Sequence, residues 1–438
     1  MRNTLLPKMV SVRLDYSYCG TPTFKLSDHP SYRETLTRAR DLHALLLQGQ
    51  SELLKDGAVV MTGWKTDSPF ITKEKLDEII STANSFRSQI DDFISIGIGG
   101  SYLGIRAVLE AVQGALEFRA ESPRIFFLGH HMDPAYISRT IDAMRGRRVG
   151  INAISKSGGT VEPAIAFALA LAQFSDAQVI ATTDAQKGAL REMANAAGWK
   201  TFNVPDNVGG RYSVTTPVGL FGLAVAGVDI HAFIAGARDA ESTIRSVSPE
   251  ENPAFIRAAL RFLAHKREGK KIEVASTGTY DLHSLTAWYQ QLAPESEGKN
   301  GEGLFVTPEF YTRDAHANGQ LIQEGERNIM ETFFMVEKPK TDITISAKGS
   351  PVAFLDGKSL HAVNTAFLEG IRDAHHRGGV PCMSWVFPEI TPYTIGYYMQ
   401  LEMNAVALSA LLMGQNPFIQ PGVQAYKEIA TRRVLSMQ

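Results

Sequence analysis

Short apolar segments alternate with helix-forming segments along most of this chain, and this alternation constrains the fold more than any other feature. The first series of strands is predicted at residues 93–98, 124–128, 148–154, 177–182 and 201–204, with helices between them. Short apolar strands that alternate with helices indicate a parallel sheet covered on both faces. In such sheets, ligands bind beyond the carboxyl ends of the strands.

A second series of the same kind follows the polar segment SVSPEENP at residues 246–253. We therefore expect an α/β protein with two α-β-α sandwich domains, at residues 1–240 and 241–438, each built on a mainly parallel sheet. An N-terminal extension of about 35 residues belongs to the first domain in this prediction. Strands of the second series are expected at 271–276, 328–336 and 383–387. Helices outside the first series are expected at 32–55, 73–90, 282–292, 359–376, 393–413 (long, largely apolar and expected to be buried) and, at the C-terminus, 423–435.

Composition excludes several classes of protein. The chain has 44 Lys+Arg against 46 Asp+Glu, a balance that gives no support for nucleic-acid binding. Its two cysteines, Cys19 and Cys382, form no disulfide framework and no metal-binding spacing. The N-terminus has no signal-peptide pattern, and the most apolar window, 217–236, contains Asp229 and His231 and predicts a buried helix. We expect a soluble cytoplasmic protein with no membrane or nucleic-acid partner.

One strand–loop–helix segment, residues 151–167, has the composition of an anion site. Its loop reads Ser155-Lys156-Ser157-Gly158-Gly159-Thr160 and leads into an apolar helix. Backbone N–H groups at a helix N-terminus, serine and threonine hydroxyls and a lysine charge would all favour a bound anion. Ser and Thr are also ordinary helix caps, so on these residues alone an anion site and a capped turn stay equally open.

Several common catalytic motifs are absent. The run Gly97-Ile98-Gly99-Gly100-Ser101-Tyr102 begins like a dinucleotide fingerprint, but Tyr102 stands where the third glycine belongs. The sequence has no GxxxxGK[ST], HExxH, paired CxxC or GxSxG. A P-loop nucleotidase, a metal-dependent enzyme and the commonest hydrolases are therefore not expected.

Four further segments concentrate polar side chains, and each has an ordinary structural alternative. Arg211 follows two glycines, where it could stabilise an oxyanion or lie on a surface turn. Glu295 and Glu297 close a predicted helix, where they could equally be solvated charges. His316 could be structural, and Lys427 could be a surface residue of the last helix.

In this order and at these separations, the segments resemble the glucose-6-phosphate isomerase family, also called the phosphoglucose isomerase family. The resemblance extends from about residue 60 to the end, and the length suits the shorter bacterial type. The motifs that carry it are IGIGGSxLG at 96–104, SKSGTTxE at 155–162, GGRYS at 209–213, QxxxESxGK at 291–299, HxxxQxIQEG at 316–325 and QxGVxxxK at 420–427.

The resemblance implies a sugar isomerase fold and the reversible conversion of glucose 6-phosphate to fructose 6-phosphate, in glycolysis and gluconeogenesis. Ring opening and a cis-enediolate intermediate would need acid–base groups but no metal and no cofactor. Glu295 matches the family's base, His316 and Lys427 its ring-opening residues, and Arg211 the group that stabilises the enediolate. The resemblance also implies a homodimer in which His316 reaches the site of the partner subunit.

Substrate binding is implied for a further set of residues, which hold the phosphate and the sugar in the family. Glu162 matches an acid of the phosphate loop and is expected to orient basic partners. Two positions depart from the family pattern: Gly159 replaces a threonine, which predicts weaker phosphate binding at most, and Ile419 replaces an aspartate, which could alter how Lys427 is held. The binding residues are Ser101, Ser155, Lys156, Ser157, Thr160, Gln291 and Gln420.

Two other functions remain open from the sequence. A non-catalytic sugar-phosphate sensor would need the phosphate loop but not Glu295, His316, Lys427 and Arg211 together. An isomerase with a different or mixed preference, for example for mannose 6-phosphate, would carry the same residues.

Overall fold

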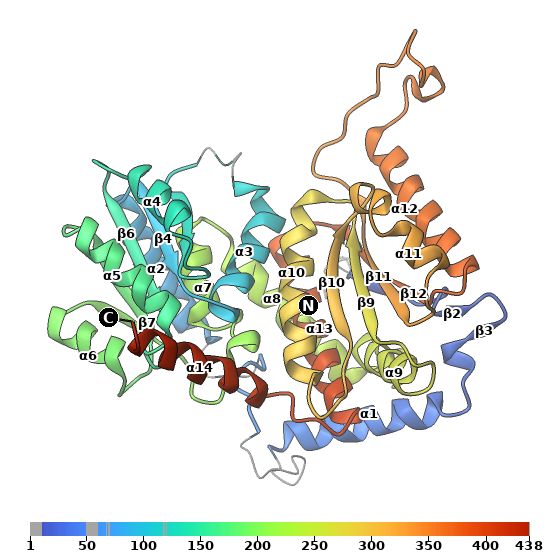
Figure 1. The fold of residues 1–438 in the computed structure, drawn as a ribbon, viewed down its shortest axis with the longest axis horizontal. Coiled ribbons are helices and arrows are strands. Elements are labelled where there is room, and N and C mark those ends of the chain that lie inside the picture. The colour runs from blue at the N-terminus through green and yellow to red at the C-terminus, as the bar shows by residue number, and fades with distance from the viewer. Residues whose placement is uncertain are drawn as a thin grey trace, which may run out of the picture.

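The computed structural model describes residues 11–49, 60–66, 68, 71–116, 119 and 121–437. The described chain contains two five-stranded sheets and one small two-stranded sheet. The two large sheets lie side by side, each with helices packed against it (Figure 1).

The first large sheet is entirely parallel, as the first series of strands predicts. Its order is β5-β4-β6-β7-β8. The chain thus enters at β4, forms the edge strand β5, and then adds β6, β7 and β8 on the other side of β4. Every residue of β4 and β6 is buried, which explains their continuous apolar composition. The strands are β4 (Asp92–Ile96), β5 (Arg124–Leu128), β6 (Val149–Ile154), β7 (Gln178–Thr183) and β8 (Lys200–Asn203).

Helices cover both faces of the first sheet because alternate residues of its strands point to opposite faces. On β4, Ile94 and Ile96 pack with one set of helices, and Phe93 packs with the other. The first set consists of α4 (Pro134–Asp142), α5 (Val161–Gln173) and α6 (Ala189–Ala197). The second set consists of α2 (Lys73–Ser88), α3 (Gly100–Gln113) and α7 (Pro217–Val225).

The second large sheet has the order β1-β12-β11-β9-β10 and is parallel except for β1. Its strands are β1 (Arg13–Asp15), β9 (Ile272–Thr277), β10 (Phe305–Phe310), β11 (Ile329–Lys338) and β12 (Cys382–Glu389). One face carries α11 (Gly319–Glu324) and α12 (Leu360–Arg377). The other carries α1 (Tyr32–Leu47), α9 (Pro253–Lys266), α10 (His283–Glu297) and α13 (Pro392–Leu412).

These layers confirm the predicted fold class of two α-β-α sandwiches with mainly parallel sheets. The N-terminal extension, however, lies with the second sheet: Arg13 of β1 pairs with Val386 of β12, and α1 packs on α9 and α13. The small sheet of β2 (Gly20–Thr21) and β3 (Phe24–Lys25) lies between β1 and α1 in the chain. Residue 240 falls inside α8 (Ile230–Ser246), so the division of the chain there remains a prediction. Residues 50–55 of the helix predicted at 32–55 lie outside the described residues.

The apolar window at 217–236 forms two helices, not the single helix that its composition predicts. After α7 the chain turns at Gly227, whose φ of 82° favours glycine, and Asp229 then accepts a hydrogen bond from Ala232 N as the cap of α8. Within the described residues, no helix is long and apolar enough to cross a membrane.

Two segments project from the layers. Residues 339–359 form an arm between β11 and α12, seen at the top of Figure 1. The last helix, α14 (Gln424–Leu435), has no buried residue, in contrast to α13, which is buried over nearly its whole length.

Candidate active site

The carboxyl ends of β4 and β6 bring two small-residue loops to one edge of the first sheet. The strands are neighbours, with Ile96 opposite Ala153. Gly97–Gly100 follows β4 and starts α3, so Ser101 lies in the first turn of that helix, half-buried. Residues 155–160 follow β6 and start α5. The predicted phosphate loop and Ser101 therefore lie at adjacent strand ends.

The phosphate loop is folded around its own hydroxyl groups. Gly158 N donates to Ser155 Oγ at 3.0 Å, and Gly159 N donates to Ser157 Oγ at 3.1 Å. Thr160 is the N-cap residue of α5, but its side chain makes no capping hydrogen bond. Because the first N–H groups of a helix have no partner within it, this end of α5 offers donors to an anion.

Lys156 supplies the positive charge of the loop and is anchored to the turn after β8. Its Nζ donates to Asp206 O at 3.0 Å and lies 3.3 Å from Asp206 Oδ1. Asp206 is mostly exposed, so this ion pair is solvated and weak. Glu162 lies half-buried in the first turn of α5 and has no ion pair among the described residues, so its expected orienting role remains a prediction.

Two glycines let three distant segments meet beside this edge. A Cβ on Gly99 would lie 2.7 Å from Gln291 Nε2, and a Cβ on Gly100 would collide with the carbonyl of Gly210. At Gly100 only glycine permits this close approach of two backbones, and at Gly99 glycine also suits the φ of 58°. The start of α3, the turn that holds Arg211 and the end of α10 are thus in direct contact.

Glu295 lies at the centre of the contacts made by this group. Its Oε1 is 3.1 Å from Arg211 Nη1, and its Oε2 accepts a hydrogen bond from Gln291 Nε2 at 3.0 Å. The Glu295 side chain is 24% exposed, whereas that of Arg211 is 2% exposed. The carboxylate is therefore accessible, and the guanidinium beside it is held within the protein.

Arg211 is fixed from several sides. Its Nη2 donates to the carbonyls of Pro417 at 2.6 Å and Ile419 at 3.2 Å, and its Nη1 donates to Gln420 Oε1 at 3.1 Å. At the position where the family has an aspartate, Ile419 therefore contributes a backbone carbonyl, which any residue would supply. A planar guanidinium with this many partners keeps one orientation.

Ser296 and Lys299 also support the site, although no role for either could be predicted from the sequence. Ser296 Oγ accepts from Arg211 Nε at 2.9 Å and lies 3.0 Å from the hydroxyl of Tyr212. Lys299 Nζ donates to the carbonyls of Glu295 at 3.1 Å, Ser296 and Ile419 at 3.2 Å. Their place in the run 291–299, next to Glu295, is the only signal in the sequence that could have identified them.

Burial raises the pKa of Tyr212 to about 12, so its phenol stays protonated at neutral pH. Tyr212 also stacks on Trp64, with ring centroids 5.0 Å apart. The phenol is therefore a fixed neutral partner of Ser296 and adds no charge beside Arg211.

Within the described residues, no hydrogen bond or ion pair joins the other two predicted catalytic residues to this group. His316 is exposed at the end of a short 3₁₀ helix, η7 (Arg313–His316), beyond β10. Lys427 is exposed on α14. One chain therefore brings together Glu295, Arg211, Gln291 and Gln420, but leaves His316 and Lys427 on its surface.

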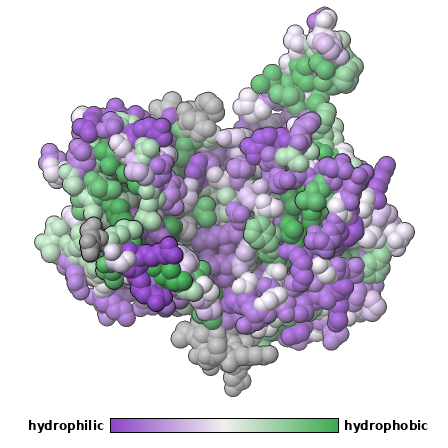
Figure 2. Space-filling view, viewed as in Figure 1, coloured by the Kyte–Doolittle hydropathy of each residue, from purple (hydrophilic) through white to green (hydrophobic). Residues whose placement is uncertain are grey.

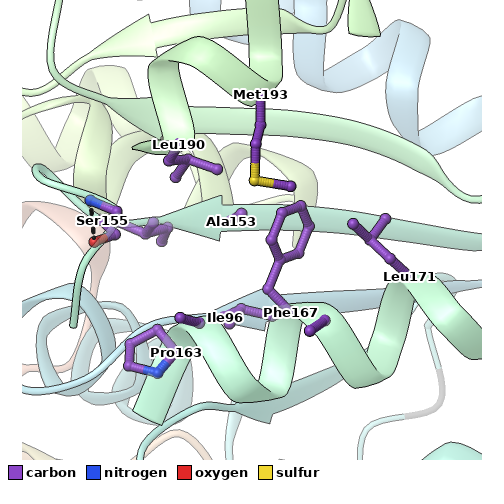
Figure 3. Close-up of a pocket in the computed structure, with 12 residues that line it drawn as sticks. Ile96, Ala153, Ser155, Pro163, Phe167, Leu171, Leu190 and Met193 are labelled. Atoms are coloured by element: carbon purple, nitrogen blue, oxygen red, sulfur yellow. Dashed lines mark hydrogen bonds between the residues drawn. The ribbon is translucent and has the colours of Figure 1, made fainter. Parts of the chain in front are cut away.

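An apolar cavity of about 130 Å³ lies behind the phosphate loop, between α5 and α6. Phe167 and Met193 point into it, while Ser155 lies at its edge (Figure 3). Apart from the loop residues Ser155 and Gly158 at its edge, the lining is apolar, so the polar groups that could hold a sugar phosphate lie on the loop and not inside the cavity.

The arrangement can perform acid–base chemistry on an anionic substrate. An accessible carboxylate with a fixed guanidinium can take a proton and stabilise the negative charge that develops. The hydroxyls and N–H groups at the end of β6 can hold a phosphate.

Comparison with known proteins gives a consistent result. A model of the phosphoglucose isomerase family matches residues 33–437. Glucose-6-phosphate isomerase from Symbiobacterium thermophilum is 43% identical over 383 residues, which cover 84% of this chain and 85% of that protein. The enzyme from Parabacteroides distasonis is 41% identical, with the same coverage of both chains.

Solved structures show the same fold. A hypothetical protein from Thermus thermophilus has a TM-score of 0.82 at 30% identity, covering 97% of this chain and 100% of that one. A glucose-6-phosphate isomerase from Chlamydia trachomatis has a TM-score of 0.79 at 21% identity, covering 93% of this chain and 86% of that one.

Proposed function

The chain belongs to the phosphoglucose isomerase family and interconverts glucose 6-phosphate and fructose 6-phosphate, and from this premise we propose how its residues carry out the reaction. The reaction is an aldose–ketose isomerisation of glycolysis and gluconeogenesis. We place it in the cytoplasm.

Glu295 is the base of the isomerisation. It removes the proton from C2 of the open-chain aldose and returns it to C1 of the cis-enediolate, so one carboxylate serves both steps. Arg211 stabilises the negative charge of the enediolate oxygens. Its contacts with Pro417, Ile419 and Ser296 support this role, because they hold the guanidinium in place when Glu295 turns to the substrate.

The phosphate binds at the loop after β6, through Ser155, Ser157, Thr160 and the N–H groups at the start of α5, with Lys156 adding charge. Ser101 completes the pocket from the adjacent strand end. Gln291 and Gln420 orient the sugar, since both already contact the Glu295–Arg211 pair. Holding both ends of the substrate fixes C1 and C2 against the carboxylate.

Ring opening is assigned to Lys427 and to His316 of a second copy of the chain. A ring opens when a proton reaches the ring oxygen and another leaves the O1 hydroxyl, so two groups are needed besides Glu295. The exposure of His316 in one chain supports its delivery across a homodimer interface.

Exposed apolar residues on the arm at 339–359 also support a homodimer. Ile343 is 62% exposed and Phe354 is 73% exposed. Figure 2 shows the apolar surface on this projecting part of the molecule. Such a surface on a projecting segment is typical of a protein–protein contact.

The observation that carries this proposal is the contact between Glu295 and Arg211 beside Gln291 and Gln420. The test is a coupled assay that supplies fructose 6-phosphate and detects glucose 6-phosphate through a dehydrogenase, with a chelator present. Glu295→Gln should abolish turnover, by at least about 10³-fold, since the amide cannot accept the proton. Calorimetry should show nearly unchanged binding of fructose 6-phosphate. Equal loss of turnover and binding would instead make Glu295 a structural residue.

A further inference from the structure

The loop that carries His316 connects the edge strand β10 to α11, and its starting point is rigid. Tyr311, the first residue after β10, is buried, and its hydroxyl donates to Glu331 Oε1 at 2.6 Å. Glu331 is also 2.6 Å from His375 Nδ1 of α12. The loop therefore leaves the sheet from a fixed position.

A buried carboxyl group, Glu309, holds the far side of the same loop. Glu309 lies near the end of β10 and is 6% exposed. Its Oε1 accepts a hydrogen bond from Asn318 Nδ2 at 2.6 Å. Asn318 stands two residues after His316 and directly precedes α11, yet its side chain does not cap that helix. The side-chain amide of Asn318 is therefore bonded to β10 and not to the start of α11.

Asp314 closes the loop from its other side, two residues before His316. Its Oδ2 accepts from Phe310 N at 2.6 Å, and its backbone carbonyl accepts from the N–H groups of Ala317 and Asn318. The two carboxyl groups, Glu309 and Asp314, thus hold the loop on both sides of His316. The His316 side chain makes no hydrogen bond or ion pair among the described residues, so its position depends on the hydrogen bonds of Glu309 and Asp314 that hold the loop.

The two carboxyl groups interact, so the ionisation of each affects the other. Burial raises the pKa of Glu309 to about 7; the hydrogen bond from Asn318 opposes this rise, and the charge and hydrogen bond of Asp314 add to it. The pKa of Asp314 is lowered, chiefly by its hydrogen bonds with Arg313. A protonated Glu309 can donate a hydrogen bond to the Asp314 carboxylate, whereas an ionised Glu309 would set two negative charges against one another. The charged or titratable groups facing Glu309 are Asp314 and Arg313 of η7, Glu331 of β11, and Tyr311.

We propose that Glu309 is a positioning residue for the isomerase reaction, which holds the loop 311–318 so that His316 is presented at a fixed place for ring opening. The inference rests on the proposed role of His316. Glu309 need not touch the substrate, because it acts through its bond with Asn318 and its contact with Asp314.

The test measures kcat and KM for the full chain with fructose 6-phosphate. Glu309→Ala should lower kcat about tenfold and leave KM within about twofold, because a misplaced acid–base group slows the chemistry without removing the phosphate contacts. Glu309→Gln keeps the shape and the acceptor for Asn318, so it should retain at least about half of the activity. Glu302→Ala is the matched control: it removes a carboxylate at the opposite end of β10, bonded to His265 and Lys266.

A double-mutant cycle separates this inference from the proposed function. If Glu309 acts through His316, then Glu309→Ala in a His316→Ala background should cause no further loss. A full additional tenfold loss there, or wild-type kcat in Glu309→Ala alone, would overturn the inference. Full activity of His316→Ala alone would instead refute the ring-opening role, a distinct outcome. If Glu309→Ala fails to fold, the exposed Asn318→Ala breaks the same hydrogen bond and enters the same cycle.

The pH dependence of kcat provides a second test, because a purely structural role of Glu309 would leave it unchanged. The amide introduced by Glu309→Gln cannot ionise, so this variant loses the titration near pH 7. The ratio of its kcat to that of the wild type should rise between pH 6 and pH 8.5, as Glu309 of the wild type loses its proton and repels Asp314. A ratio that stays constant across this range would contradict the proposed contact.

Discussion

Replacing Gly100 with alanine should slow catalysis by moving Arg211, a residue more than a hundred positions away. Gly100 is buried in the first turn of α3, against the turn that carries Arg211. A Cβ there would lie 2.8 Å from Arg211 N and closer still to the Gly210 carbonyl. Both neighbours are backbone atoms, which cannot rotate aside as a flexible side chain would.

The size of the effect follows from these contacts. To reach an ordinary separation of 3.4 Å, Arg211 N must move by about 0.6 Å, and the Gly210 carbonyl must move further. Overpacking of this kind costs about 1–3 kcal/mol of stability. A displacement approaching 1 Å at a catalytic group costs up to about 10²-fold, so we expect kcat to fall about 10- to 100-fold.

The assay is the coupled isomerase reaction, with kcat corrected for the folded fraction measured by circular dichroism. Gly370→Ala is the control, because a Cβ at this position of α12 meets nothing within 4 Å and the helix should gain about 0.5–1 kcal/mol. Undiminished kcat in Gly100→Ala would refute the close approach of α3 to the Arg211 turn. A loss equal to the loss of folded protein would refute the claim that Arg211 is displaced.

Two further predictions concern the phosphate loop and acid stability. Gly159→Thr should restore a hydroxyl to the loop and lower KM about two- to fivefold. The loop has room for the side chain, because its Cβ would lie an ordinary 3.7 Å from Ser157 Oγ. An unchanged KM would show that the hydroxyl does not reach the phosphate. Burial and the adjacent Lys65 lower the pKa of His43 to about 3. Between pH 6.5 and pH 3 the unfolded chain therefore binds a proton at His43 that the folded chain does not bind. The free energy of unfolding falls as the pH falls through this range. Urea unfolding should therefore show that His43→Gln loses about 2 kcal/mol less than the wild type between pH 7 and pH 5, and equal losses would place the acid sensitivity elsewhere.

The sequence was most informative where strands are buried on both faces. β4 and β6, in which every residue is buried, deviate from the predicted bounds by one or two residues, and the partly buried edge strand Arg124–Leu128 has the predicted bounds. Continuous apolar runs between helices leave few other structures open to these segments.

Strands at the edges of the second sheet were not predicted, and the reasons are physical. β10 contains Pro308, and proline disfavours a strand because it has no backbone N–H to donate. An edge strand tolerates proline, since one side of the strand has no neighbour that needs a donor. β1 is only three residues long, and its partner β12 lies at the other end of the chain. No local pattern encodes a pairing over that separation.

For the site, the family motifs pointed to residues that the structure brings together, such as Glu295, Arg211 and Gln291. Their contacts depend on Gly99 and Gly100, whose role is visible only when the packed backbone is seen. The roles of Ser296 and Glu309 were not foreseen, because serine and glutamate have many ordinary positions and only burial and partners set these two apart.

The pairing of β1 with β12 has a consequence for the synthesis of the protein. Arg13 leaves the ribosome long before its partner Val386. At about 5–20 residues per second, roughly 20–75 s pass between the synthesis of β1 and that of the strand that completes its ladder. The first sandwich, by contrast, has all its strands within residues 92–203 and can close during translation. The second sheet is therefore completed only after β12 has been made, when two segments that lie far apart in the polypeptide meet.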